Sequence, residues 1–348
     1  MTQLSATQRD LLCPFCAGQC VFSPAAGALV CESCGEGHAI IVDPAHDPTR
    51  EFHYDPETPH TEQPVLTEDR VHQCETCGGA VVFTGPALSD RCGYCDGPVV
   101  LGGRDERFQA LGLIPFRLTE AEAQTRAIDW VRRRLAAPTD LADTVSRARV
   151  AGFYVPFFTF DSHEAVDYWA RYRTGSGDKA RTHSVKGSMS IVFDDLLAPA
   201  SPHITPMIRD GILHDFNPED LRPYIPAYLS GFAAEQHHLS VSEGLAANEA
   251  DKRLLIRNRI KTHINKSRII DIGYKTHTSG IHYRRILLPV WILHYSYNNT
   301  AMKVVVCGMR GRTFGERPFS PFKLAGYSAA ISALAIVFGW VWGAAGWF

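Results

Sequence analysis

Two stretches decide the fold of this chain: CETCGGAVVFTGPALSDRCGYC at residues 74–95 and CPFCAGQCVFSPAAGALVCESC at residues 13–34. Each holds two Cys-x-x-Cys pairs separated by fourteen residues, and the two stretches align at an offset of 61 residues. Two residues between cysteines let one tight turn offer both sulfurs to a metal ion, and two such turns complete a tetrahedral site. The sequence therefore predicts a repeated zinc ribbon with four cysteine ligands in each copy.

Eight of the ten cysteines form these pairs, and we assign them to two structural zinc ions: Cys13, Cys16, Cys31 and Cys34 to the first, and Cys74, Cys77, Cys92 and Cys95 to the second. A unit of ~30 residues buries too little apolar surface to fold alone, so the metal supplies the missing stability. Four cysteines leave no open position for catalysis. Two alternatives stay open: iron accepts the same ligands, and Cys20 or His38 could replace a ligand of the first site.

The turns after the cysteine pairs favour glycine, because they need a residue with positive φ. Gly35 and Gly78 directly follow their pairs, and Gly18 and Gly97 come one place later after the other two pairs. We expect these glycines to make the turns. Cys307, in VVVCGM, is expected to be a buried strand residue.

Composition bounds the class of protein. The chain has 348 residues, is 45% hydrophobic and 21% charged, and carries a net charge of −2, which indicates two or three globular domains and no general attraction to nucleic acid. Its first residues lack a basic segment followed by an apolar core, so we expect no secretory signal and no disulfides.

The predicted order is a first ribbon (11–42), a proline-rich linker (43–71), a second ribbon (72–101), an α+β body (108–320) and a transmembrane helix (324–348). In the body, a capping box at Thr119 and Glu122 begins one helix, and residues 243–267 form another. Strands are expected at 152–161, 165–173, 187–195, 284–297 and 301–309, with an irregular region over 198–230 and a turn at Asn298-Asn299.

A helix followed by strands with an internal proline occurs twice, at YVPFFTF (154–160) and LLPVWIL (287–293). This order predicts a duplicated unit of one helix and antiparallel strands. The prolines further predict an edge strand or a strand start.

Several motifs of catalytic chemistry are absent from the sequence: there is no G-x-x-x-x-G-K-[ST], no G-x-S-x-G and no H-E-x-x-H. We therefore expect no ATPase motor and no enzyme. His237-His238 is interpreted as a surface loop, Asp194-Asp195 as a solvated strand end, and the arginines at 132–134 as a helix end. The basic helix over 250–268 is interpreted as a solvated face, with contact to lipid or phosphate as the alternative.

The last twenty-five residues, 324–348, carry no charge and are long enough to cross a bilayer. Tryptophans gather at the far end (Trp340, Trp342 and Trp347), and cations precede the segment (Arg310, Arg312, Arg317 and Lys323). The positive-inside rule then predicts a single-pass cell-membrane protein with its N-terminal bulk in the cytoplasm. Gly339 and Gly343 form one G-x-x-x-G, which allows helix pairing and a homo-oligomer. The alternative is a buried core helix.

Four stretches together carry a resemblance: the paired ribbons, GFYVPFFTFD (152–161), YIPAYLSGFAAE (224–235), and LLPVW with GERPFS (287–291 and 315–320). The chain resembles bacterial membrane-anchored double zinc-ribbon proteins, a group often labelled primosomal or helicase-like. The resemblance implies a scaffold with zinc-ribbon cysteines and a C-terminal anchor, partnered by SPFH-domain or phage-shock-type membrane-stress proteins. It implies no catalytic residues.

The expected function is a non-enzymatic, tail-anchored adaptor that presents zinc ribbons for protein–protein interaction at the cytoplasmic face. The alternative is a nucleic-acid-binding ribbon protein of replication or transcription. Against it, residues 13–34 contain no Lys or Arg and residues 74–95 contain only Arg91, whereas phosphate contact needs cations.

Overall fold

The computed structural model describes residues 11–42, 47, 49–58, 65–66, 71–83, 91–101 and 106–344. Trp347, the first ten residues and most of the expected linker lie outside the described residues. Within the described ranges the chain is a mixed α+β protein, as predicted, with one sheet of twelve strands and five α-helices. The helices are α1 (Glu120–Arg132), α2 (Leu141–Ser146), α3 (Pro206–Leu213), α4 (Val241–Ile264) and α5 (Pro321–Ala344).

The strands of the large sheet are β4 (Phe52–Tyr54), β6 (Val71–Cys74), β7 (Ala80–Phe83), β8 (Val99–Leu101), β10 (Gly112–Leu113), β11 (Arg149–Thr174), β12 (Arg181–Pro199), β13 (Arg222–Pro223), β14 (Ala233–Glu235), β15 (Ile269–Tyr297), β16 (Thr300–Cys307) and β17 (Thr313–Gly315).

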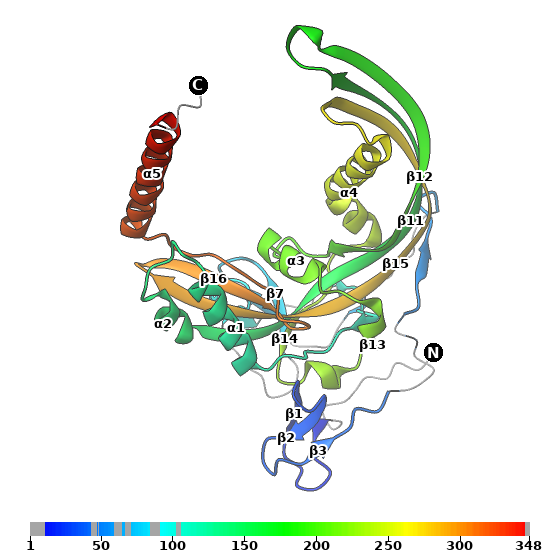
Figure 1. Ribbon diagram of the computed structural model, residues 1–348. Coiled ribbons are helices and arrows are strands. Elements are labelled where there is room, and N and C mark those ends of the chain that lie inside the picture. Colours follow the sequence, from blue (N-terminus) through cyan, green and yellow to red (C-terminus); the bar gives the residue numbers. More distant parts are fainter. Residues whose placement is uncertain are drawn as a thin grey trace.

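Two very long strands organise the body. β11 has 26 residues and β15 has 29, and they pair antiparallel from Arg149↔His294 to Tyr172↔Ile269. Where the sequence predicts two strands, at 152–161 and 165–173, β11 runs through both with a register shift between Asp161 and His163. Figure 1 shows the far halves of β11, β12 and β15 bending as one curved sheet, with α4 on its concave side.

The sequence of β11 explains its two environments. Residues 153–160 are apolar without alternation except at Thr159, and every one of them is buried, because other elements cover both faces of the sheet there. Residues 164–170 alternate between buried and exposed, because that half has one face on α4 and one in solvent. Phe116, Tyr154, Phe232 and Trp291 fill the core beside the first half, with the Phe116 and Phe232 rings stacked at 4.3 Å.

Both internal prolines lie on central strands, so the expectation of an edge or a strand start is wrong. The register sets Tyr154 opposite Pro289 and Pro156 opposite Leu287. Each proline carbonyl points outward, away from the β11–β15 pair, and accepts a hydrogen bond from Ala200 N or Gly308 N at 3.0 Å. The missing N–H therefore faces a break in the pairing on the outer side of each strand. On the outer side of β11 this break lies between β14 and β12, and on the outer side of β15 it lies between β10 and β16.

Local signals in the sequence are confirmed. Thr119 and Glu122 form the predicted capping box of α1, and Asn298 and Asn299 both have positive φ, 48° and 60°, in the turn between β15 and β16. The order of a helix and an antiparallel hairpin occurs twice, as α1–β11–β12 with α2 inserted and as α4–β15–β16. Duplication of one unit stays a prediction.

The two cysteine units have different places in the fold. The first forms its own sheet of β1 (Cys20–Ser23), β2 (Ala28–Cys31) and β3 (Gly37–His38). The second supplies β6, β7 and β8 to the large sheet, because β7 pairs with β14 and β14 pairs with β11. Part of the expected linker is also a strand, since β4 pairs with β15 at Ile281–Tyr283. A two-stranded sheet of β5 (Val65–Leu66) and β9 (Glu106–Arg107) completes the strands.

Candidate metal centres and membrane helix

The four cysteines of the second unit converge on one point. Their Sγ atoms all lie within 4.8 Å of one another, with 3.5 Å between Cys74 and Cys95 and 3.8 Å between Cys77 and Cys92. Tetrahedral coordination with metal–sulfur bonds of ~2.3 Å requires sulfur–sulfur distances of ~3.8 Å. The donor set and its spacing therefore fit one metal ion.

The first unit has the same geometry. The Sγ distances are 3.7 Å between Cys13 and Cys34 and 3.5 Å between Cys16 and Cys31, and the four atoms again lie within 4.8 Å of one another. The predicted ligand sets of both units are thus brought together, and the protein has two four-cysteine clusters that could each hold a metal ion.

The four turns share one backbone conformation, but two of the predicted glycines do not make them. The residue directly after each pair has positive φ in every case: 57° at Ala17, 75° at Gly35, 75° at Gly78 and 62° at Asp96. The expectation for Gly18 and Gly97 is therefore wrong. These glycines are required for space instead, because a Cβ at Gly18 would lie 2.5 Å from Ser33 Oγ and a Cβ at Gly97 would lie 2.2 Å from Thr76 Oγ1.

Backbone N–H groups favour the thiolate form of Cys74 and Cys13, whereas burial raises the pKa of Cys92 and Cys77. In the second unit Thr76 N and Tyr94 N each donate to a cysteine Sγ at 3.4 Å, to Cys74 and Cys92 respectively. Burial opposes ionisation of Cys74, but the N–H groups of Cys77 and Thr76 outweigh it and lower the pKa of Cys74 to about 7. Similar N–H groups lower the pKa of Cys13 to about 6 against the effect of burial.

Buried polar contacts fix the second centre to the body. Tyr94, two residues after Cys92, donates its hydroxyl to the carboxylate of Glu235 on β14, and this carboxylate is fully buried. Ser201 Oγ donates to the same carboxylate at 2.9 Å, and His238 Nε2 lies 3.3 Å from it. The ring of Tyr94 also packs edge-on against Phe153 of β11 at 4.6 Å. The second metal centre is therefore part of the core.

The first centre lies at the periphery of the molecule, as the β1–β3 sheet in Figure 1 shows. Phe22 inserts into the core, its N–H donates to Ser230 O at 3.0 Å, and Ser230 Oγ donates to Cys20 O at 2.7 Å. Farther from this attachment, the knuckles are open: Cys16 and Cys34 are exposed, and Phe15 is 77% exposed.

Cys20 and His38 both lie close to the first site, so the alternative ligation stays open. His38 Nε2 is 3.3 Å from Cys13 Sγ, and Cys13, Cys20 and His38 form a second group within 4.8 Å. Cys20 is 1% exposed, and its pKa is raised to about 11, mainly by burial and to a smaller extent by the neighbouring cysteines. Cys307 is fully buried in β16, as predicted, and burial raises its pKa to about 12.

Three polar residues differ from the interpretation of their segments, whereas Asp194 and the other six basic residues of 250–268 are exposed, as interpreted. His237 is fully buried, and its Nε2–H donates to the carbonyl of Phe157 at 3.0 Å, so it is no surface loop. Asp195 forms an ion pair with the buried Arg284. Lys252 does not belong to a solvated face, because its Nζ lies 2.6 Å from the fully buried carboxylate of Glu164. All three depend on partners far away in sequence, and no local pattern signals such partners.

The C-terminal segment forms one helix that is long and apolar enough to cross a membrane. The span covers Pro321–Trp342, 22 residues, with a mean hydropathy of 1.8 in its most apolar window and none of that window buried. Figure 1 shows α5 standing away from the sheets. The alternative of a buried core helix is therefore wrong, while the orientation in a membrane stays a prediction.

Across 331 residues the chain is 24% identical to "Uncharacterized protein YdjG" of Bacillus subtilis (strain 168), and the alignment covers 92% of this chain and 93% of that protein. No family model and no solved structure matches the chain. The two cysteine clusters and α5 are therefore the features of the chain that bear on its function.

Proposed function

We propose that this protein is a non-enzymatic membrane adaptor, anchored by α5, that holds two structural zinc ions and presents its first zinc ribbon to a protein partner. One observation carries the proposal: the first unit is fixed at one end by Phe22 and exposes its knuckles, with Phe15, at the other. An exposed aromatic side chain on a rigid turn is a typical anchor in protein–protein recognition.

The two ions have different tasks in this proposal. The second ion closes β6–β8 onto the large sheet through Tyr94 and Glu235, so it stabilises the body. The first ion makes a small rigid surface that a ~30-residue segment could not form alone. Zinc fits four thiolates without redox chemistry, and iron would be recognised by the visible absorption of ferric thiolate.

The anchor places this surface at a membrane. The cations Arg310, Arg312, Arg317 and Lys323 precede the apolar segment, which favours a cytoplasmic body. The resemblance to membrane-anchored double zinc-ribbon proteins names the partner class, an SPFH-domain or phage-shock-type protein. Nucleic acid is the weaker candidate because the described part of the first ribbon has no Lys or Arg between Cys13 and Cys34.

The test uses the full chain, purified by an affinity tag from gently solubilised membranes, with mass spectrometry of bound proteins and of metal content. We expect an SPFH-domain or phage-shock-type protein that is lost with Phe15→Ala and retained with Val192→Ala, a control residue that is 57% exposed on β12. Recovery of replication or transcription proteins that disappear on nuclease treatment would contradict the proposal. A variant that lacks residues 324–348 should leave the membrane fraction in high salt, and its retention there would refute the anchor.

A further inference from the structure

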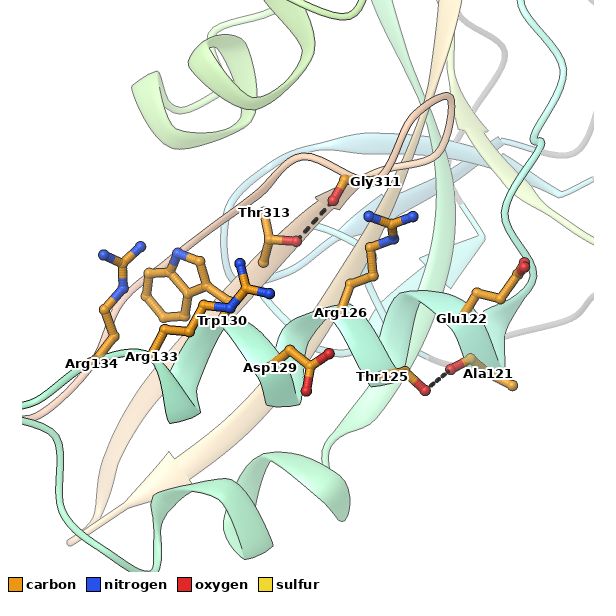
Figure 2. Close-up of a pocket in the computed structure, with 10 residues that line it drawn as sticks. All are labelled: Ala121, Glu122, Thr125, Arg126, Asp129, Trp130, Arg133, Arg134, Gly311 and Thr313. Atoms are coloured by element: carbon orange, nitrogen blue, oxygen red, sulfur yellow. Dashed lines mark hydrogen bonds between the residues drawn. The ribbon is translucent and has the colours of Figure 1, made fainter.

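A large open cavity lies along one side of α1. Its volume is about 820 Å³, and its lining includes Arg126, Asp129 and Trp130 of the helix, its C-cap Arg133, Gly311, and Thr313 at the start of β17. Arg126, Trp130 and Arg133 are four and three residues apart, so they share one face of α1. Figure 2 shows the guanidinium groups of Arg126 and Arg133 on the side of α1 that faces Gly311 and Thr313.

The basic residues of the cavity are available to a ligand, whereas its acidic residues have partners. In the described ranges, no ion pair within 4.0 Å joins Arg126, Arg133 or Arg134 to a carboxylate, although the charge of Arg126 acts on Glu122 at longer range. Glu122 accepts from Thr119 N and Oγ1, both at 2.8 Å, at the end where α1 begins, and Asp129 lies 4.0 Å from Arg132. The end of the cavity near the C-terminus of α1 is therefore positively charged.

Two further arginines, Arg134 and Arg317, pack over the ring of Trp130 at this end of the cavity. The guanidinium of Arg134 lies 4.6 Å from the ring centre of Trp130, and that of Arg317 lies 5.8 Å from it. The Nε atoms of both arginines are buried without a hydrogen-bond partner. Arginines held on an aromatic face keep their remaining N–H groups in a fixed fork, which suits the oxygens of a phosphate.

The chain just after α1 lies beside the first turns of the apolar helix. Ser320 N donates to Ala136 O at 2.8 Å, Lys323 Nζ donates to Ala137 O at 2.7 Å, and the Tyr327 hydroxyl donates to Leu135 O at 3.2 Å. Tyr327 is seven residues beyond Ser320, or ~10 Å along a helix. The end of α1 thus reaches the depth at which α5 would enter a bilayer.

Apolar side chains around this junction are also exposed. Leu135 is 75% exposed, Phe319 is 58% exposed and Phe322 is 88% exposed. Exposed apolar residues beside arginine, lysine and tryptophan are the composition of a surface at the boundary between headgroups and acyl chains.

We propose that the cavity binds the phosphate of an anionic phospholipid in the leaflet that α5 enters, with Arg126 and Arg133 as the contacting cations and Arg134 and Arg317 beside them. The inference rests on the proposed role of α5 as an anchor. A free phosphate has the same chemistry, but the position at the base of α5 favours the headgroup of a lipid, whose acyl chains continue along the helix.

The test is native mass spectrometry of the detergent-solubilised full chain, titrated with phosphatidylglycerol or phosphatidylcholine. The variant is Arg126→Gln/Arg133→Gln, in which both replaced side chains are exposed and Gln keeps the helix propensity. The matched control is Arg257→Gln/Arg259→Gln on α4, which removes the same charge from exposed positions. We expect the cavity variant to bind phosphatidylglycerol about tenfold more weakly or worse, the control to bind as the wild type does, and phosphatidylcholine to show no such difference.

Each other outcome overturns the inference. Equal affinity of the cavity variant and the wild type for phosphatidylglycerol would show that the cavity is not the binding site. Loss of this affinity in the α4 control variant alone would place the lipid contact on α4. Displacement of the lipid by micromolar sn-glycerol 3-phosphate would indicate that the ligand of the cavity is a soluble phosphate. A parallel carbonate wash of reconstituted vesicles separates the two proposals: release of the wild type refutes the anchor, whereas retention without lipid selectivity refutes the cavity site alone.

Discussion

Replacement of Lys252 by Met should loosen α4 from the curved sheet. Lys252 is 15% exposed, its Nζ lies 2.6 Å from Oε1 of Glu164, and Glu164 is fully buried. Removal of one partner of a buried ion pair costs about 3–5 kcal/mol, because the other charge stays buried. Thr276 and Thr278 still donate to this carboxylate, each at 2.8 Å, so we expect the lower end, about 3 kcal/mol.

The assay is hydrogen–deuterium exchange of α4 peptides in the solubilised full chain, since a metal protein with an apolar helix has no single free energy of unfolding. A loss of about 3 kcal/mol accelerates opening about 150-fold. Lys261→Met is the matched control, because Lys261 is exposed on the same helix. Equal protection of α4 in the two variants would refute the reasoning.

The same prediction can be tested through the pH dependence of the Glu164–Lys252 ion pair. Burial opposes the charged form of Glu164, but Lys252, Thr276 and Thr278 outweigh burial and lower the pKa of Glu164 below its usual 4.5. In the wild type this stabilisation is complete above pH ~4.5 and is lost as the pH falls through the lower, folded-state pKa. In Lys252→Met the pKa should rise, so acidification from pH 7 to 5 should narrow the gap between the variant and the control. Glu164→Gln/Lys252→Met should restore most of the protection, since no buried charge is left.

Three further predictions test the metal centres, a buried histidine and a turn. Cys92→Ser should remove one metal ion and accelerate hydrogen exchange in β14 and β11, whereas Cys31→Ser should remove the other and leave β11 protected, as metal analysis and exchange on the same samples would show. Burial lowers the pKa of His237 to about 3, so its contribution to stability is constant above pH 6.5 and should fall by about 1.4 kcal/mol per pH unit from pH 6.5 down to about pH 3. His237→Gln should flatten this slope when hydrogen exchange of β14 and β11 is compared with the wild type at each pH. Asn299→Gly should slow hydrogen exchange in β16, because glycine accepts the φ of 60° without strain, and Asn299→Ala should accelerate it. In each case the free energy of opening should change by about 1 kcal/mol.

Features that depend on neighbours in sequence could be predicted. The capping box of α1 requires only Thr119 and Glu122, and the turn at Asn298 needs only residues that tolerate positive φ. The eight candidate ligands follow from spacing, because each knuckle is closed by a hydrogen bond from the residue after the pair to the carbonyl of the first cysteine, as from Gly78 N to Cys74 O at 2.9 Å. Such signals are complete within five residues.

Features that depend on distant partners could not be predicted. Asp195 and Arg284 are 89 positions apart, and their pairing follows from the register of β11, β12 and β15. His237 gives no sign of its burial, because its acceptor is a backbone carbonyl, of Phe157, that every residue type possesses. The central position of the prolines has the same cause, because the gap beside Pro156 on the outer side of β11 depends on where β14 ends and β12 begins.

The two copies of the cysteine motif lie in different environments, and this difference is the basis for proposing different roles for them. The two units share cysteine spacing and Sγ geometry, although only the first has further donors, Cys20 and His38, close to its cluster among the described residues. The difference lies in what each unit offers outside its ligands: Tyr94 of the second finds a buried carboxylate and Phe153, whereas Phe15 in the first knuckle of the first unit stacks only on its own His38, at 5.9 Å, among the described residues. The second unit, whose Tyr94 is buried, is part of the core, so we expect a metal ion bound there to stabilise the large sheet. A unit whose aromatic side chain is exposed keeps a free surface, which is why we place the partner there.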